Sequence, residues 1–417
     1  MKLNWHTLIQ NTCYKDNFPK TEQRNAFVRD VDRVTFSDYF KRLMRKTQVH
    51  PLTGNDHVHN RLLHSLEVAS VGRSIASMVF HQLREREELP ISNVYEFASI
   101  VQAACLAHDL GNPPFGHNGE AALKEWFANQ SELREAVGER YSDFIRYDGN
   151  ASSFRIVTGF TNSIDSGIKL TLPSIAAIVK YPWFSGEAAK DKFSFFYSNA
   201  ADVKAVMGAL GCMLDGHCVR HPLSYLSEAA DDICYSLLDI EDAVALKIVD
   251  KQAALNLYKS YDIDETNNVS HARSRLIGRW IDAVVANFFT AYDDIMSGIA
   301  VDLTANLDIE RAKDFADLHI YHDTHTANLM IGAYQIYNRI LDTFIPPLFN
   351  KHLGKASSKD EYVLTHMKRS FLPEGYEAQD LYTQLMYVVD QVTGMTDNFS
   401  METAAVFSGA GDSSWRW

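Results

Sequence analysis

Apolar residues recur every three or four positions along most of the chain, as at Val68, Val71 and Ile75. This spacing places side chains on one face of an α-helix, so it predicts helices that each bury one face. Alternation of apolar and polar residues, which is typical of strands, is scarce. Its best short candidates are RIVTGF at 155–160 and KFSFFY at 192–197. We therefore predict a mainly α fold with at most a small β element.

At 417 residues, the chain is long enough for one large domain or two of ordinary size. No internal repeat or low-complexity linker separates two parts. We expect a core over residues 1–250 and a helical C-terminal region over residues 251–417. A single continuous helical domain is the alternative.

The composition argues against a membrane or secreted protein. No apolar run approaches the roughly 20 residues that a membrane span needs, and the N-terminus lacks the basic and apolar segments of a secretory signal. The five cysteines are odd in number, scattered and without a CxxC pair, which argues against a disulfide framework and a thiolate zinc site. We expect a cytoplasmic protein with reduced cysteines.

The net charge of -13 creates a field that repels nucleic acid. An anionic small substrate would meet the same field. It would therefore have to be attracted by a metal ion and a few well-placed Lys or Arg side chains.

The most informative segment is AACLAHDLGNPPFGHNGE at 103–120, where His108 and Asp109 end an apolar helix and a Gly/Pro-rich turn follows. Adjacent helical residues point about 100° apart, so both reach one metal only where the backbone opens at a helix end. A His-Asp pair alone is weak evidence. The chain has another, His322-Asp323, which we interpret as ordinary surface or packing polarity.

Two further residues accompany the first pair. His64 falls on the inward side of an amphipathic helix, where it is either a ligand or a core histidine bonded to a carbonyl. Asp231, Tyr235 and Asp239 are spaced i, i+4 and i+8 beside an apolar seam. Carboxylates in that position need a cation, and a surface charge cluster is the alternative.

Two imidazoles and two carboxylates form a borderline-to-hard donor set. Such a set suits Mn²⁺ or Mg²⁺, and also Fe²⁺, Co²⁺ or Zn²⁺, with room for water. A metal of this kind lowers the pKa of its bound water and neutralises charge on a phosphoryl oxygen. The pattern therefore indicates phosphoester hydrolysis.

The order of His64, His108-Asp109 and Asp231 resembles the HD-domain metal phosphohydrolases. Longer motifs resemble the bacterial deoxyguanosine triphosphate triphosphohydrolases, relatives of the vertebrate dNTPase that restricts viruses. They are RKTQVHPLTGNDHVHNRLLHSLEVA, HDLGNPPFGHNGEAAL and EAADDICYSLLDIEDA, with weaker similarity at KYPW, KFSFFYS and GMTDNFS. The resemblance implies an HD-domain helical bundle with additional C-terminal helices.

The resemblance also implies roles for individual residues. The metal ligands would be His64, His108, Asp109 and Asp231. His117 would transfer a proton, and the Glu120 carboxylate would orient the His117 ring. The substrate contacts would be Gln48, Arg61, Asn112, Lys180, Lys192, Tyr235 and Asp239. Tyr235 and Asp239 would contact the deoxyribose, Gln48 the sugar and base, and the basic side chains the phosphates. Asn112 replaces a histidine that many relatives carry, and an amide cannot carry a proton at neutral pH.

The function implied is hydrolysis of a deoxynucleoside triphosphate, dGTP favoured, to deoxynucleoside and tripolyphosphate, with metal-activated water attacking the α-phosphorus. The partners implied are the dNTP, further copies of the chain in a tetramer or hexamer, and an effector that is single-stranded DNA or a nucleotide. One rival is another HD-domain phosphohydrolase that acts on a monophosphate, cyclic or alarmone nucleotide. Another is a nucleotide- or DNA-binding regulator with an idle metal site.

Overall fold

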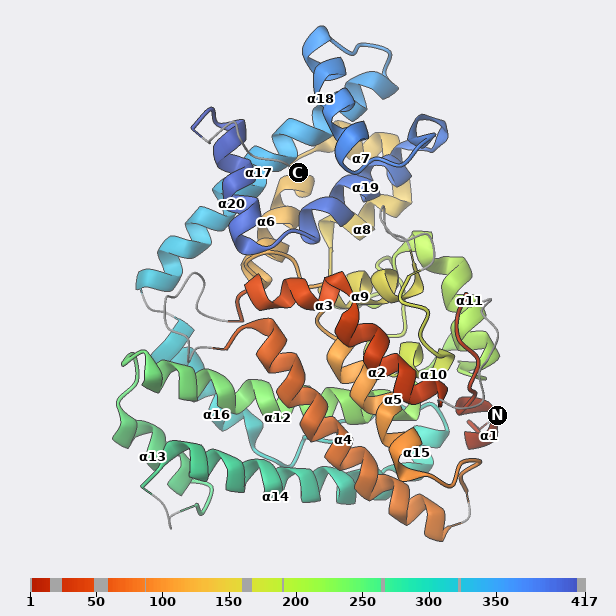
Figure 1. Cartoon of the computed structure of the whole chain (residues 1–417), viewed down its shortest axis with the longest axis vertical. Helices are drawn as coiled ribbons and strands as arrows, with labels where there is room; N and C mark the ends of the chain where they lie inside the picture. Colours follow the sequence, from red (N-terminus) through yellow and green to blue (C-terminus); the bar gives the residue numbers. More distant parts are fainter. Residues whose placement is uncertain are drawn as a thin grey trace.

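The computed structural model describes residues 2–15, 25–48, 59–86, 88–159, 167–189, 191–263, 267–321 and 324–410, without the side chains of 321–330. These residues form a mainly α structure, which confirms the predicted fold class (Figure 1). The second His-Asp pair, at 322–323, lies outside the described residues. Among the described helices, none combines the length and low polarity that crossing a bilayer requires.

The first part of the chain supplies the helices that surround the candidate site. In chain order they are α1 (Trp5–Leu8), α2 (Ala26–Phe36), α3 (Asp38–Arg42), η1 (Leu43–Arg45), α4 (Arg61–Glu85), α5 (Val94–Ala107), α6 (His117–Ala128), α7 (Ser131–Val137), η2 (Gly138–Tyr141), α8 (Ser142–Ile145), α9 (Gly149–Thr158), α10 (Leu172–Ala176), η3 (Tyr197–Asn199), α11 (Ala200–Ala209) and α12 (Pro222–Ala245). Side chains cap several of these helices. Asn60, for example, accepts a hydrogen bond from the Leu63 amide at the start of α4.

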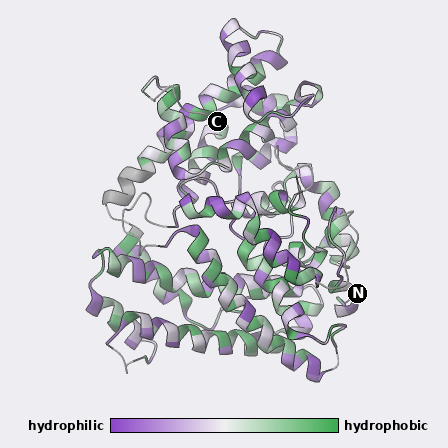
Figure 2. Cartoon of the chain, viewed as in Figure 1, coloured by the Kyte–Doolittle hydropathy of each residue, from purple (hydrophilic) through white to green (hydrophobic). Residues whose placement is uncertain are grey.

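The remaining helices extend this arrangement. They are α13 (Lys251–Lys259), α14 (Val269–Thr290), α15 (Tyr292–Met296), α16 (Ile309–Ala316), η4 (Asp317–Tyr321), α17 (Thr324–His352), α18 (Ser358–Ser370), η5 (Tyr376–Ala378), α19 (Leu381–Thr393) and α20 (Asp397–Phe407). Hydrophobic and hydrophilic segments both occur along these helices, as expected of helices that bury one face (Figure 2).

The small β element lies elsewhere than the sequence predicted. The strands β1 (Met213–Leu214) and β2 (His217–Cys218) form an antiparallel pair. The expectation of a strand at 155–160 is wrong, since residues up to Thr158 belong to α9 and Gly159 ends that helix in a left-handed conformation. At 192–197 the pairing is limited to one isolated bridge, between Phe184 and Phe195. Short apolar runs that are buried on every side carry too little periodicity to distinguish a strand from a helix.

Buried apolar residues gather in two clusters. The first joins α2, α4, α5, α12 and α14. The second joins α6, α17, α18, α19 and α20, which lie at the other end of the molecule in Figure 1. Leu110 belongs to the first cluster and Phe115 to the second, so the Gly/Pro-rich turn passes from one core to the other. The division of the chain near residue 250 stays a prediction.

Candidate active site

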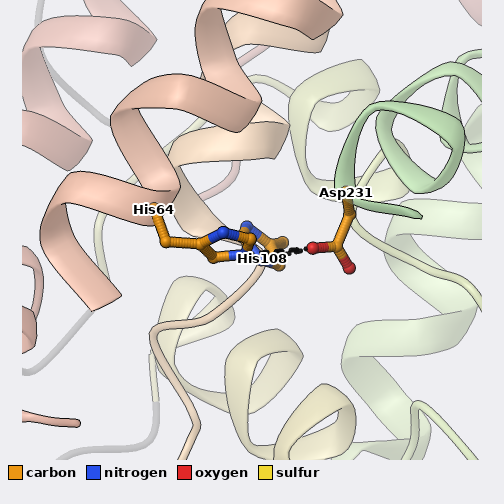
Figure 3. A group of neighbouring side chains, drawn as sticks. All are labelled: His64, His108 and Asp231. Carbon is orange, nitrogen blue, oxygen red and sulfur yellow. Dashed lines mark hydrogen bonds and ion pairs between the residues drawn. The ribbon is translucent and has the colours of Figure 1, made fainter. Parts of the chain in front are cut away.

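Three of the four residues expected to bind a metal converge on one point. His64 lies on α4, His108 follows the last residue of α5, and Asp231 lies on α12. Asp231 Oδ1 is 3.1 Å from His64 Nε2 and 3.4 Å from His108 Nε2. The two imidazoles and the carboxylate point toward one another (Figure 3). Each of the three side chains offers one ligand atom, and these atoms all lie within 4.8 Å of one another. The cluster could therefore hold a metal ion.

The hydrogen bonds of His108 fix its ring for metal binding. Its Nδ1 lies 2.6 Å from the Cys105 carbonyl oxygen and therefore donates to it. The lone pair of Nε2 then faces Asp231, since a neutral imidazole carries its proton on one nitrogen. On His64 the buried Nδ1 has no hydrogen-bond partner among the described residues. Two imidazole nitrogens and a carboxylate oxygen that lie this close together are ligands that a divalent metal takes, so the residues present fit such an ion.

Asp109 lies beside this cluster but is held by other groups. Its Oδ1 is 3.8 Å from His108 Nε2, while Arg61 Nη1 donates to its Oδ2 over 2.6 Å. The amide of Asn112 donates to its Oδ1. Burial acts to raise the pKa of Asp109, but the Arg61 guanidinium and the nearby imidazoles outweigh it and hold that pKa well below the usual range. Asp109 is therefore a charged carboxylate at the edge of the metal cluster.

Lys180 is tied to the same cluster through Asp231. Its Nζ donates to Asp231 Oδ2 over 2.6 Å, and only 13% of its side chain is exposed. Burial acts to lower the pKa of Lys180, but the Asp231 carboxylate raises it above its ordinary value. This bond leaves the other oxygen of Asp231 facing the imidazoles.

His117 and Glu120 pair across the first turn of α6. His117 Nδ1 lies 3.1 Å from Glu120 Oε2, and the Gly149 amide donates to Glu120 Oε1 over 2.9 Å. Burial acts to raise the pKa of Glu120, but His117, Lys192 and the Gly149 amide lower it to about 2. Because 71% of the His117 side chain is exposed while Glu120 is buried, a fixed carboxylate orients an accessible imidazole.

The tight turn before α6 needs its glycine. Gly116 has a φ of 56°, and a Cβ there would stand 2.5 Å from Arg61 Nη2. The turn is therefore packed directly against Arg61. Arg61 itself is buried, and its Nε has no hydrogen-bond partner among the described residues.

Two buried ionisable residues that the sequence analysis did not single out support this turn. Lys46 Nζ donates to the carbonyl oxygens of Asn112 and Thr393. Asp397 accepts from the Phe115 amide over 3.0 Å and from Thr47. The turn is thereby tied to the end of α19 and the start of α20. The partners are 66 to 350 residues apart along the chain, so no local sequence pattern shows these contacts.

Lys192 stands at the other side of the acid-base pair. Its Nζ is 4.0 Å from Glu120 Oε2 and 3.7 Å from Asp148 Oδ2. Its side chain is 41% exposed. The sequence analysis did not single out Asp148, which caps the start of α9 in the structure.

Three further residues, Tyr235, Asp239 and Gln48, are predicted to contact the nucleoside. Tyr235 and Asp239 lie one and two turns beyond Asp231 on α12, where Tyr235 is partly exposed and Asp239 is buried. Gln48 follows η1, and its Oε1 is buried without a hydrogen-bond partner among the described residues. The roles of these three side chains stay predictions.

Comparison with known proteins gives two findings. A sequence model of the HD domain matches residues 61–147. The chain is 35% identical to a deoxyguanosinetriphosphate triphosphohydrolase-like protein of Pseudomonas aeruginosa, over 98% of this chain and 99% of the relative. A like-named protein of Synechocystis is 30% identical, over 90% and 92%, and the deoxyguanosinetriphosphate triphosphohydrolase of an Enterobacter species is 26% identical, over 96% and 97%.

The HD-domain match covers only part of the site. His64, His108, Asp109, His117 and Glu120 fall inside it. The third member of the metal cluster and the two lysines come from later in the chain. The full-length relatives therefore bear on a larger part of the site than the domain match does.

Proposed function

Because the chain belongs to the family of deoxyguanosinetriphosphate triphosphohydrolase-like proteins and contains an HD domain, we propose that it hydrolyses a deoxynucleoside triphosphate. The products are the deoxynucleoside and intact tripolyphosphate, and dGTP is the favoured substrate. The observation that carries this proposal is the convergence of His64, His108 and Asp231 beside the buried Lys180. Cationic and metal-binding groups at one point suit a polyphosphate.

One divalent ion, Mn²⁺ or Mg²⁺ first among the candidates, would be held by His64, His108 and Asp231, with Asp109 as the fourth ligand. When bound, it would supply charge neutralisation at a phosphoryl oxygen and a nucleophilic water of lowered pKa. The Cys105 carbonyl keeps the His108 ring turned toward this site. Lys180 keeps the Asp231 carboxylate charged.

Three cationic side chains would neutralise the triphosphate. Arg61 and Lys180 act from within the site, where they also hold Asp109 and Asp231. Lys192 is the most accessible of the three, with 41% of its side chain exposed against 13% for Lys180 and 6% for Arg61. It would meet the outer phosphates first.

The proton would be handled by His117. As water attacks the α-phosphorus, the bond between that phosphorus and O5′ breaks, and His117 protonates the departing O5′. Glu120 orients the ring through its bond to Nδ1, which leaves Nε2 to face the leaving group. Asn112 can hydrogen-bond at the site but cannot share the proton.

Selection of the deoxyribose would fall to α12 and Gln48. The Tyr235 ring would occupy the space that a 2′-hydroxyl needs, and Asp239 would accept from the 3′-hydroxyl. Gln48 would contact the sugar and base. We further propose that the protein acts in the cytoplasm as a homotetramer or homohexamer, with a nucleotide or single-stranded DNA as effector.

The test is to incubate the metal-stripped protein with each of the four dNTPs and with GTP, adding Mn²⁺ or Mg²⁺, and to separate the products by chromatography. We expect metal-dependent release of deoxynucleoside and tripolyphosphate, absent with GTP and lost in Asp231→Ala. Asp293→Ala is the matched control, because Asp293 is a surface carboxylate whose side chain is 91% exposed.

Other outcomes would point elsewhere. Release of diphosphate or single phosphate would move the cut away from the α-phosphorus and favour another HD-domain phosphohydrolase. Salt-dependent binding of single-stranded DNA with no turnover of any dNTP would favour a regulator.

A further inference from the structure

Two buried carboxylates share one ammonium at the open side of the site. Glu120 and Asp148 are 4% and 1% exposed, and Lys192 Nζ lies 4.0 Å from the first and 3.7 Å from the second. Both distances are those of ion pairs and exceed hydrogen-bond length. The carboxylates therefore hold the ammonium electrostatically, and its N–H donors stay available for another acceptor.

Lys180 behaves in the opposite way. Its Nζ donates directly to Asp231 over 2.6 Å and is largely covered. Of the two lysines expected at the phosphates, Lys192 is thus the one whose hydrogen-bonding capacity remains unspent on protein groups within the described residues. Phosphate binding by Lys192 would therefore depend on the groups that hold its ammonium in position.

Both carboxylate oxygens of Asp148 are held by neighbouring groups. Its Oδ1 accepts from the amide and the side chain of Asn150, over 2.8 Å and 2.7 Å, and so caps the start of α9. Its Oδ2 is left to face Lys192 and the Phe193 amide, which is 3.4 Å away. The amide of the next residue, Gly149, donates to Glu120. One helix start therefore fixes both carboxylates that face the ammonium.

The charges at this point require one another. Burial and the charge of Glu120 raise the pKa of Asp148, and Lys192 opposes that rise. Burial acts to lower the pKa of Lys192, but Glu120 and Asp148 together raise it. Removing the negative charge at 148 would leave Glu120 as the only carboxylate among the described residues that pairs with the ammonium.

We propose that Asp148 is a positioning residue that holds the Lys192 ammonium in place for the outer phosphates of the substrate. The proposal rests on the proposed function for the identity of that substrate. Asp148 would thus both cap α9 and position the cation that binds the phosphates.

The test is a double-mutant cycle between Asp148→Asn and Lys192→Met, read by calorimetric binding of inorganic tripolyphosphate at fixed Mg²⁺ concentration. Asparagine keeps the cap and removes the charge. We expect Asp148→Asn to weaken binding about two- to fivefold, the scale of a partly exposed ion pair, and to have no further effect when Lys192 is already methionine. In turnover, KM should rise by a similar factor with kcat within about twofold.

A purely structural role would give another result. Equal weakening in both backgrounds, or none in either, would overturn the proposal. Asp148→Ser provides a second uncharged cap should the asparagine variant unfold, and Asp380→Asn is the control, because Asp380 caps α19 away from this site. Since tripolyphosphate binding needs no turnover, coupling without dNTP hydrolysis would sink the proposed function alone, whereas hydrolysis without coupling would sink only the role of Asp148.

Discussion

The two ends of the candidate site are built differently. At the end proposed to bind the metal (the metal end), His64 lies on α4, His108 follows α5 and Asp231 lies on α12, and these helices pack against one another in the first apolar cluster. At the end proposed to transfer the proton (the proton-transfer end), His117 is the first residue of α6 and Lys192 lies on a loop, with 71% and 41% of their side chains exposed. The first arrangement is fixed before any ligand arrives, whereas the second leaves its functional atoms accessible to the substrate.

Because of this difference, substitutions at the two ends should affect stability and catalysis to different degrees. A change at the metal end alters buried charges and helix packing together, because each ligand is paired with another buried group. A change at an exposed side chain of the other end can remove a chemical step while the fold persists.

The largest effect is expected at the metal end. His108→Ala removes a central ligand, so the protein should lose its bound metal and all dNTP turnover. Metal content by mass spectrometry and turnover by product chromatography check this. Stoichiometric metal and undiminished turnover in the variant would show that the cluster of Figure 3 is not the metal site.

His117→Ala should lower kcat by a factor of about 10²–10⁴, the usual contribution of a general acid. Metal content and the midpoint of thermal unfolding should stay at the wild-type values, because the side chain is mostly exposed. His217→Ala, at an exposed histidine on β2, is the control. Loss of metal along with activity would mean that the two ends are not separable.

His221 should make the metal-bearing core sensitive to acid. It is fully buried at the start of α12, where Nε2 donates to the Leu8 carbonyl and Nδ1 accepts from the Leu223 amide, so both nitrogens are satisfied in the neutral form. Burial lowers its pKa from 6.5 to about 4. The unfolded chain takes up the proton first as pH falls, so this stabilisation is present above pH 6.5 and is lost toward pH 4.

The loss should amount to roughly 3 kcal/mol of unfolding free energy. Urea unfolding at pH 7 and pH 4.5 measures it, and the difference from His221→Asn isolates it, since asparagine can cap the helix without titrating in this range. The same pH dependence in both proteins would rule out the assignment to His221.

The smallest effect concerns specificity. Tyr235→Ala should open the space beside the sugar and lower the preference for dGTP over GTP about tenfold, a typical scale for a steric contact in a pocket. Ratios of kcat/KM for the two nucleotides, with metal content as a check on α12, measure it. An unchanged ratio would remove Tyr235 from the sugar site.

The sequence allowed the prediction of most of the metal end and little of what supports the other. His64, His108 and Asp231 stood in helical motifs whose spacing places them inward, and the structure brings them together. The pairing of Asp109 with Arg61 and of Asp231 with Lys180 could not be foreseen, because each joins residues about 50 positions apart. Helical periodicity says which face is buried but not which helices meet.

The support of the proton-transfer end depends on still longer separations. Thr47 meets Asp397 across 350 residues, and Lys46 meets Thr393 across 347. Lys46 and Asp397 lie within the RKTQVH and GMTDNFS segments, but these motifs do not show which groups the two side chains meet, so only the folded arrangement reveals that they hold the turn. The same holds for Asp148, whose ion pair with Lys192 is evident only in the folded structure.

Hydrolysis of dGTP in H₂¹⁸O with Mn²⁺, followed by mass spectrometry of both products, tests whether water attacks the α-phosphorus. Attack of water on the α-phosphorus predicts unlabelled deoxyguanosine and tripolyphosphate that carries one ¹⁸O at a terminal phosphorus. Label in the nucleoside, or in diphosphate or single phosphate, would contradict the proposed reaction.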